Sequence, residues 1–125
     1  SLVISIDYND KMEIIINSGK KNTKIKLIYF IKEVINKCQP GELLLTSIDR
    51  EGTWKGFDFD LSSYIAKNTS IPVIGHGGAS SINDINEILS KTDLSGVALG
   101  SMVLYQKKGM GVLINFPNKR LLSQY

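Results

Sequence analysis

The chain has 125 residues, of which 42% are hydrophobic, and its 15 basic and 12 acidic side chains leave a net charge of +3. This composition is typical of one soluble globular unit with a hydrophobic core. No apolar run approaches the roughly 20 residues of a membrane span, and no basic block with interleaved aromatic residues indicates a nucleic-acid partner.

The first third of the chain predicts a strand, a small hairpin arm and a helix. Leu2–Ile6 is the first strand, and Met12–Asn17 is a second β-leaning run, which we expect to cover the site rather than to join the main sheet. A polar loop follows at Ser18–Thr23. Apolar residues then recur at helical spacing over Ile25–Cys38, and a Pro-Gly pair ends this helix.

The rest of the chain alternates strands with helices. Glu42–Ile48 is apolar and short enough for a buried parallel strand. Asp58 or Asp60 caps a helix that runs to Lys67. The next elements are a strand at Pro72–Gly75, a helix capped by Ser81 and running to Lys91, a strand at Gly96–Leu99 and one helical turn at Met102–Tyr105. We assign no regular element to the tail, residues 106–125.

This alternation predicts right-handed βαβ units and a parallel sheet. Four such units form half of a (β/α)₈ barrel. The fold class is therefore α/β, as a single half-barrel unit over residues 1–125. A free four-stranded piece leaves two bare edges, which natural sheets avoid. We therefore expect a partner, either the missing half of a barrel or a second copy of this chain.

One cysteine, Cys38, excludes an internal disulfide framework and a cysteine-based metal cluster. The sequence indicates a reducing, cytoplasmic setting and suggests neither a metal nor a cofactor. The chain starts without Met, directly in a strand-like run, and shows no secretion signal. We interpret it as a fragment or a trimmed product.

The stretch from Gly41 to Asp58 is the centre of the predicted site. Its buried strand ends in Thr46 and Ser47, and Asp49, Arg50 and Gly52 follow at once, so that hydroxyls, a carboxylate, a guanidinium and a flexible backbone reach one spot. In α/β sheets and barrels this spot, the carboxyl end of a strand, is where ligands bind. The alternative is an ordinary loop, because turns and sites share residue types.

Two glycine loops each follow a strand and open a helix. They contain Gly77 and Gly78 in the first loop, and Gly100 and Ser101 in the second. Glycine lets the backbone approach an anion, and a helix start offers unpaired N–H groups. The pair matches the phosphate grip of barrels, although tight turns alone also explain it. We expect valine at Gly77 or Gly78 to remove phosphate binding and to leave the fold intact.

Three other positions are candidates for chemistry. Asp7, at the end of the first strand, is suited to general acid or base catalysis, or to capping a turn. His76 is suited to contacting a phosphate or moving a proton, or to bonding loop backbone. Lys20 and Lys21 lie in a loop that can close over an anionic substrate, or they form an ordinary solvated pair.

The segments VISID, SGKKNT, LLTSIDREGTWKGFD and IPVIGHGGAS closely resemble the C-terminal half of the cyclase subunit of imidazole glycerol phosphate synthase. The resemblance covers Leu2 to Tyr105, with the motifs in the same order and spacing. In that family, ammonia from a glutaminase partner passes through a (β/α)₈ barrel. It reacts with a phosphoribulosyl-formimino carboxamide ribotide to give imidazole glycerol phosphate, in histidine biosynthesis, and an aminoimidazole carboxamide ribotide.

The resemblance also implies roles for single residues. Asp7 matches the catalytic general acid at the end of the fifth barrel strand. The implied substrate- and phosphate-binding residues are Lys20, Thr46, Ser47, Asp49, Gly52, Gly77, Gly78, Gly100 and Ser101, and Lys21 matches the same closing loop as Lys20. The family's second catalytic Asp belongs to the first half of the barrel, so this chain alone should not catalyse the full reaction.

Two features depart from this family and leave alternatives open. The tail over residues 106–118 resembles that of a related branch, which pairs with an amidotransferase to amidate sugars of surface polysaccharides. His76 replaces a small residue, which points the same way. The alternatives are therefore a glutamine-dependent sugar-amidation subunit and a catalytically silent, phosphate-binding half-barrel.

Overall fold

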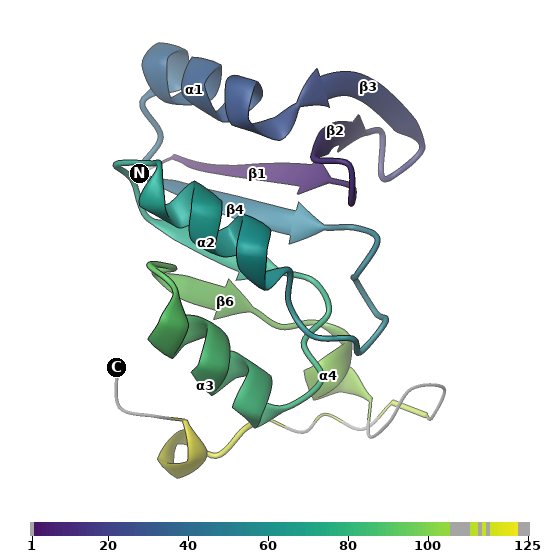
Figure 1. Ribbon diagram of the computed structural model, residues 1–125. Helices are drawn as coiled ribbons and strands as arrows, with labels where there is room; N and C mark the ends of the chain where they lie inside the picture. Colours follow the sequence, from purple (N-terminus) through teal and green to yellow (C-terminus); the bar gives the residue numbers. More distant parts are fainter. Residues whose placement is uncertain (1, 106–110, 113, 115, 123–125) are drawn as a thin grey trace.

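The computed structural model describes residues 2–105, 111–112, 114 and 116–122. Within these residues, one sheet has the strand order β3-β2-β1-β4-β5-β6 (Figure 1). The elements are β1 (Val3–Tyr8), β2 (Glu13–Ile16), β3 (Lys21–Lys26), α1 (Leu27–Cys38), β4 (Glu42–Ser47), α2 (Phe59–Lys67), β5 (Val73–His76), α3 (Ile82–Lys91), β6 (Gly96–Ala98), α4 (Ser101–Leu104) and a 3-10 turn, η1 (Lys119–Leu121).

Strands β1, β4, β5 and β6 pair in parallel, and a helix follows each of them in the chain, after the β2–β3 hairpin in the case of β1. This arrangement confirms the predicted fold class, four βα units of a half-barrel. In Figure 1, α2 lies in front of the sheet near β4, and α3 lies next to β6, below it in this view. None of the described helices is long and apolar enough to cross a membrane.

Two strands are longer at their carboxyl ends than predicted. The strand expected to end at Ile6 continues to Tyr8, and the strand expected to end at Gly75 continues to His76. Both extensions pair in parallel with β4, Asp7 and His76 each opposite Thr46. Asp7 and His76 therefore lie inside strands rather than in the loops that follow.

The hairpin prediction was wrong in two respects. Strand β2 joins the main sheet, because it pairs antiparallel with the end of β1. Half of the expected polar loop belongs to β3, which pairs with β2, so α1 begins at Leu27 instead of Ile25. Side chains stabilise this polar edge strand: the Thr23 hydroxyl donates to the Ile14 carbonyl at 2.9 Å, and the Asn22 amide donates to the Glu13 carboxylate at 2.6 Å.

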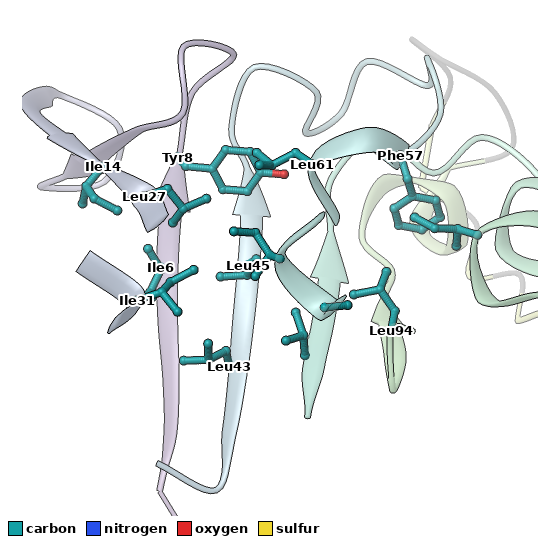
Figure 2. Packing of buried hydrophobic residues seen from close by; sticks show 14 of the residues in the cluster. Ile6, Tyr8, Ile14, Leu27, Ile31, Leu43, Leu45, Phe57, Leu61 and Leu94 are labelled. Atoms are coloured by element: carbon teal, nitrogen blue, oxygen red, sulfur yellow. The ribbon is translucent and has the colours of Figure 1, made fainter. Parts of the chain in front are cut away.

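The hydrophobic core lies on one face of the sheet. Alternate residues of β1 and β4, including Ile6, Leu43 and Leu45, are buried there, and Leu27 and Ile31 of α1 pack against them (Figure 2). Residues of the opposite parity on these strands are more exposed. The other face of the sheet, the inner face of a barrel, therefore has no helix over it in the described structure.

The helix starts follow the predicted capping chemistry. Asp58, not Asp60, caps α2 by accepting a hydrogen bond from the Leu61 N–H at 3.3 Å. Ser81 caps α3 as expected, and the helical turn expected at Met102 starts one residue earlier. Within the tail, residues 106–110, 113, 115 and 123–125 lie outside the described residues, so the prediction of a separate tail is untested.

The one-sided core predicts which helix residues control stability. Ile31 is fully buried, whereas Tyr29, two residues earlier on α1, is 68% exposed. Ile31→Ala leaves a cavity against β1, and we expect it to lower the free energy of unfolding by about 2–5 kcal/mol. Tyr29→Ala is the control, with an expected change within about 0.5 kcal/mol. Urea denaturation measures both, and equal losses would contradict this core.

Candidate functional site

Four residues form one row across the carboxyl ends of the parallel strands. The strand register pairs Asp7 with Thr46, Thr46 with His76, and His76 with Ala98. Paired residues of neighbouring strands point to the same face, and this row has the parity opposite to the buried core. The sheet therefore brings a carboxylate, a hydroxyl and an imidazole together on the inner face.

Thr46 and His76 are joined directly. Thr46 Oγ1 lies 3.2 Å from His76 Nδ1, and Thr46 is buried, with 7% of its surface exposed. This contact fixes the orientation of the imidazole ring, because its other nitrogen, Nε2, must then point away from β4. The sequence named both residues, but it contained no signal for their pairing across 30 positions.

Ser47 lies on the other side of the sheet. It pairs with Tyr8, and both side chains are buried on the helix face, with 1% and 2% exposure. Burial, followed by the charge of Asp58, raises the pKa of Tyr8, so its hydroxyl stays protonated. The structure thus does not bring the Ser47 side chain together with Asp7 and Thr46.

Gly77 and Gly78 have positive φ angles, +107° and +93°. A Cβ atom added to Gly77 would lie 2.6 Å from the Ser47 carbonyl oxygen, and one added to Gly78 would collide with the Gly56 carbonyl oxygen. Gly56 also donates its N–H to the Gly78 carbonyl at 2.8 Å. Valine at either glycine therefore cannot leave the fold intact, which corrects the expectation from the sequence.

Arg50 braces the loop after β4 from within, at the backbone that contacts this glycine loop through the Gly56 N–H. Its Nη1 donates to the carbonyls of Gly56 at 3.4 Å and Phe57 at 3.2 Å. Its Nε is buried without a hydrogen-bond partner among the described residues. The guanidinium predicted to serve the site thus bonds the loop backbone instead, a structural role that the sequence did not reveal.

Three loops meet beside His76 in a shallow hollow of about 10 Å³. A Cβ atom on Gly52 would lie 3.5 Å from Ser101 Oγ, and one on Gly100 would lie 3.5 Å from His76 Nε2. The residues lining the hollow are Glu51, Gly52, His76, Gly77, Gly78, Ala79, Ala98, Gly100, Ser101 and Met102. The enclosed space suits about one water molecule, so a larger anion has room only at the open mouth.

Lys20, Lys21 and Asp49 lie outside the row. Lys20 and Lys21 are exposed where the β2–β3 hairpin turns, and Figure 1 shows this hairpin at the carboxyl end of β1. Asp49 is exposed, and its Oδ2 accepts a hydrogen bond from the Asp10 N–H at 2.9 Å. That bond ties the loop after β4 to the turn after β1.

Asp84 organises the start of α3 and the end of the glycine loop. Its carboxylate accepts hydrogen bonds from the Ser80 N–H at 2.9 Å, the Ser80 hydroxyl at 2.6 Å and the Ser81 hydroxyl at 3.0 Å. Ser81 Oγ in turn accepts from the Asp84 N–H at 3.1 Å, a reciprocal cap. Burial alone would raise the Asp84 pKa, but the serine hydrogen bonds outweigh it and hold that pKa below its ordinary value.

A much larger cavity, of about 460 Å³, lies on the outer side between α1 and α2, with Leu27, Leu61 and Ile65 among its lining residues. It is separated from the row by the sheet. Among the described residues, no three His, Cys, Asp or Glu side chains gather in a metal-binding group.

The comparisons agree with the resemblance seen in the motifs. A family model described as "Histidine biosynthesis protein" matches residues 1–109. The imidazole glycerol phosphate synthase subunit HisF of Natranaerobius thermophilus is 35% identical over 122 residues, which cover 95% of this chain and 48% of the relative. The subunit of the same name in Sulfolobus acidocaldarius is 42% identical over 96 residues, covering 74% of this chain and 38% of the relative.

A protein of Leptospira borgpetersenii, whose name assigns it only provisionally to the same subunit, is 37% identical over 123 residues. The match covers 94% of this chain and 48% of the relative. The chain therefore spans about half the length of the curated relatives it matches.

The lowered pKa of Asp84 predicts a pH-dependent stability. A carboxyl whose pKa is lower in the folded than in the unfolded chain contributes stability above its unfolded-state pKa, and this contribution is lost as the pH falls through the folded-state pKa. We expect Asp84→Asn to cost about 1 kcal/mol at neutral pH, with a smaller difference from wild type in acid.

Urea unfolding at a series of pH values measures this difference. Asp93→Asn is the matched control, since Asp93 is exposed and makes no side-chain hydrogen bond or ion pair with the described residues. A cost for Asp84→Asn that stays constant down to strongly acidic pH would contradict the assigned role.

Proposed function

Because the chain belongs to the histidine biosynthesis protein family, we propose that it supplies the C-terminal half-barrel of a cyclase that forms imidazole glycerol phosphate. The observation that carries the proposal is that Asp7 and Thr46 lie opposite each other at the strand ends on the inner face. Barrel enzymes do their chemistry at this rim. Relatives named for this synthase support the reaction.

In this proposal the substrate is a phosphorylated ribotide, and ammonia comes from a glutaminase partner. Asp7 acts as general acid on the reacting group, since it is partly exposed on the inner face. Thr46 lines the site beside it. The glycines at positions 52, 77, 78 and 100, with Ser101, hold a substrate phosphate through backbone N–H groups, which is supported by the meeting of their loops at one hollow.

Support is weaker for three residues that the family pattern implies. Lys20 and Asp49 are exposed, and each would have to approach the substrate by a movement of its loop. Ser47 has the least support, because its hydroxyl is buried on the helix face and its carbonyl already accepts hydrogen bonds from the N–H groups of Arg50 and Glu51. A cytoplasmic setting belongs to the same proposal. The relatives described above are named for the synthase, and none is named for sugar amidation.

The chain matches only about half of the length of each of these relatives, so the proposal also includes assembly with another half-barrel. A full active site then needs a complementary half-barrel, and the glutaminase must dock on the closed barrel. The free edge of β1 supports this view. In the described structure, β2 pairs only with Asp7 and Tyr8 at the end of β1. Val3 to Ile6 keep one hydrogen-bonding edge open to another strand. Unpaired edges of this kind promote strand addition.

Asp7→Asn tests the proposed chemistry. The chain is combined with the N-terminal half of a relative, and cyclisation is measured with ammonium salts in place of a glutaminase. We expect turnover by the wild-type combination, none by this chain alone, and at least a roughly hundredfold lower kcat for Asp7→Asn with a smaller effect on KM. Asp10→Asn, in the exposed turn after β1, is the control. A kcat of Asp7→Asn near that of wild type would rule out this role.

Sedimentation velocity tests the proposed assembly. We expect the isolated chain to form a dimer or a larger species, because no described helix or strand of one copy covers the inner face or the Val3–Ile6 edge of β1. Leu44→Glu, on the inner face, should shift the chain toward monomer, whereas Tyr29→Glu, on the outer surface of α1, should not. A well-folded wild-type monomer at micromolar concentration would contradict closure of the barrel by a second copy.

A further inference from the structure

His76 is the single histidine of the chain, and the proposed reaction leaves it without a role. It is the last residue of β5 and lies between Thr46 of β4 and Ala98 of β6 in the strand register. Its partly exposed side chain therefore lies on the inner face, within the row that contains Asp7. The glycine loop begins at the next residue, Gly77.

The ring has one nitrogen held by protein and one facing the hollow. Nδ1 lies 3.2 Å from Thr46 Oγ1, and a Cβ atom built on Gly100 would lie 3.5 Å from Nε2. A threonine hydroxyl donates to an unprotonated Nδ1 or accepts from a protonated one. With the hydroxyl donating, Nε2 carries the N–H of the neutral ring, and in the imidazolium both nitrogens donate.

The hollow lacks another source of positive charge. None of its described lining residues is Lys or Arg, and Arg50 is bonded to the carbonyls of Gly56 and Phe57 instead. The surrounding charged groups are acidic: Glu51 lines the hollow, and Asp7 lies two strands away in the row. The remaining neighbours of His76 and of the hollow are uncharged: Thr46, Ala98, Gly100, Ser101 and Met102.

We propose that His76 is an anion-binding residue of this site, which donates a hydrogen bond from Nε2 to the substrate phosphate at the mouth of the hollow. This inference rests on the proposed phosphate site, and it adds the side chain that supplies positive charge to that site. A charge-assisted hydrogen bond is stronger than a neutral one. An imidazole that also carries a positive charge binds an anion more strongly, so we expect anion affinity at this site to be greater at acidic than at alkaline pH.

Sulfate is the probe, because it stays a dianion across this range whereas phosphate itself titrates. Sulfate binding to the full chain is measured by calorimetry at about pH 5.5 and about pH 8. We expect wild type to bind roughly tenfold more weakly at the higher pH. The single histidine also gives a single imidazole signal in NMR, and saturating sulfate should raise the midpoint of its pH titration.

Two substitutions separate the charge of His76 from its hydrogen bonds. His76→Asn keeps an amide near Thr46 but has no donor that reaches the hollow, so it should bind sulfate roughly tenfold more weakly at the lower pH. His76→Gln places a neutral donor near the position of Nε2 and should bind with little pH dependence. Glu51→Gln is the control for the neighbouring acid and should keep the pH dependence of wild type.

The outcomes distinguish the two proposals. Wild type that binds no sulfate at either pH would overturn the phosphate site and this inference together. Wild-type affinity and pH dependence in His76→Asn would overturn the role of His76 and leave the phosphate site standing. If that variant does not fold, the wild-type NMR titration decides, because a midpoint that sulfate leaves unchanged contradicts the proposed contact.

Discussion

Parallel pairing of β1, β4, β5 and β6 in one register is the constraint on which the site depends. The register places Asp7, Thr46 and His76 level with one another on the inner face. A slip of one residue would reverse the face of every side chain in a strand. For β4 it would turn Leu45 away from the core and Thr46 into it. Burial of the apolar side chains that face the helices therefore sets the register, and the register sets the positions of the polar row.

Close backbone contacts join the loops that follow β4 and β5. Gly77 and Gly78 lie so close to Ser47 and Gly56 that no side chain fits, and Arg50 bonds the carbonyls of Gly56 and Phe57 within the loop after β4. The glycines that hold the loops together are also the ones that can bring backbone N–H groups to an anion. Fold and proposed binding thus cannot be separated at these two positions, whereas the His76 side chain lies on the inner face at the edge of the loops.

The two faces of the sheet show why neighbouring residues have different roles. Thr46 and Ser47 are consecutive hydroxyl residues, yet Thr46 meets His76 on the inner face and Ser47 lies beside Tyr8 under α2. The described helices pack on the outer face of the sheet, and none of them covers the inner face. The uncovered inner face is consistent with a chain that spans about half the length of its relatives.

The sequence alone determined the alternation of strands and helices, the cap at Ser81, the choice of Asp58 or Asp60 as the cap of α2, and the polar residues that follow the strands. These features follow from local periodicity and turn chemistry. Only the tertiary structure decided which of two adjacent hydroxyls faces the site, that Arg50 bonds a loop, and that Thr46 meets His76. The polar edge strand β3 was also missed, since its pairing with β2 comes from side chains elsewhere in the hairpin. Contacts between residues far apart in the chain depend on strand register and close approach, which no local pattern encodes.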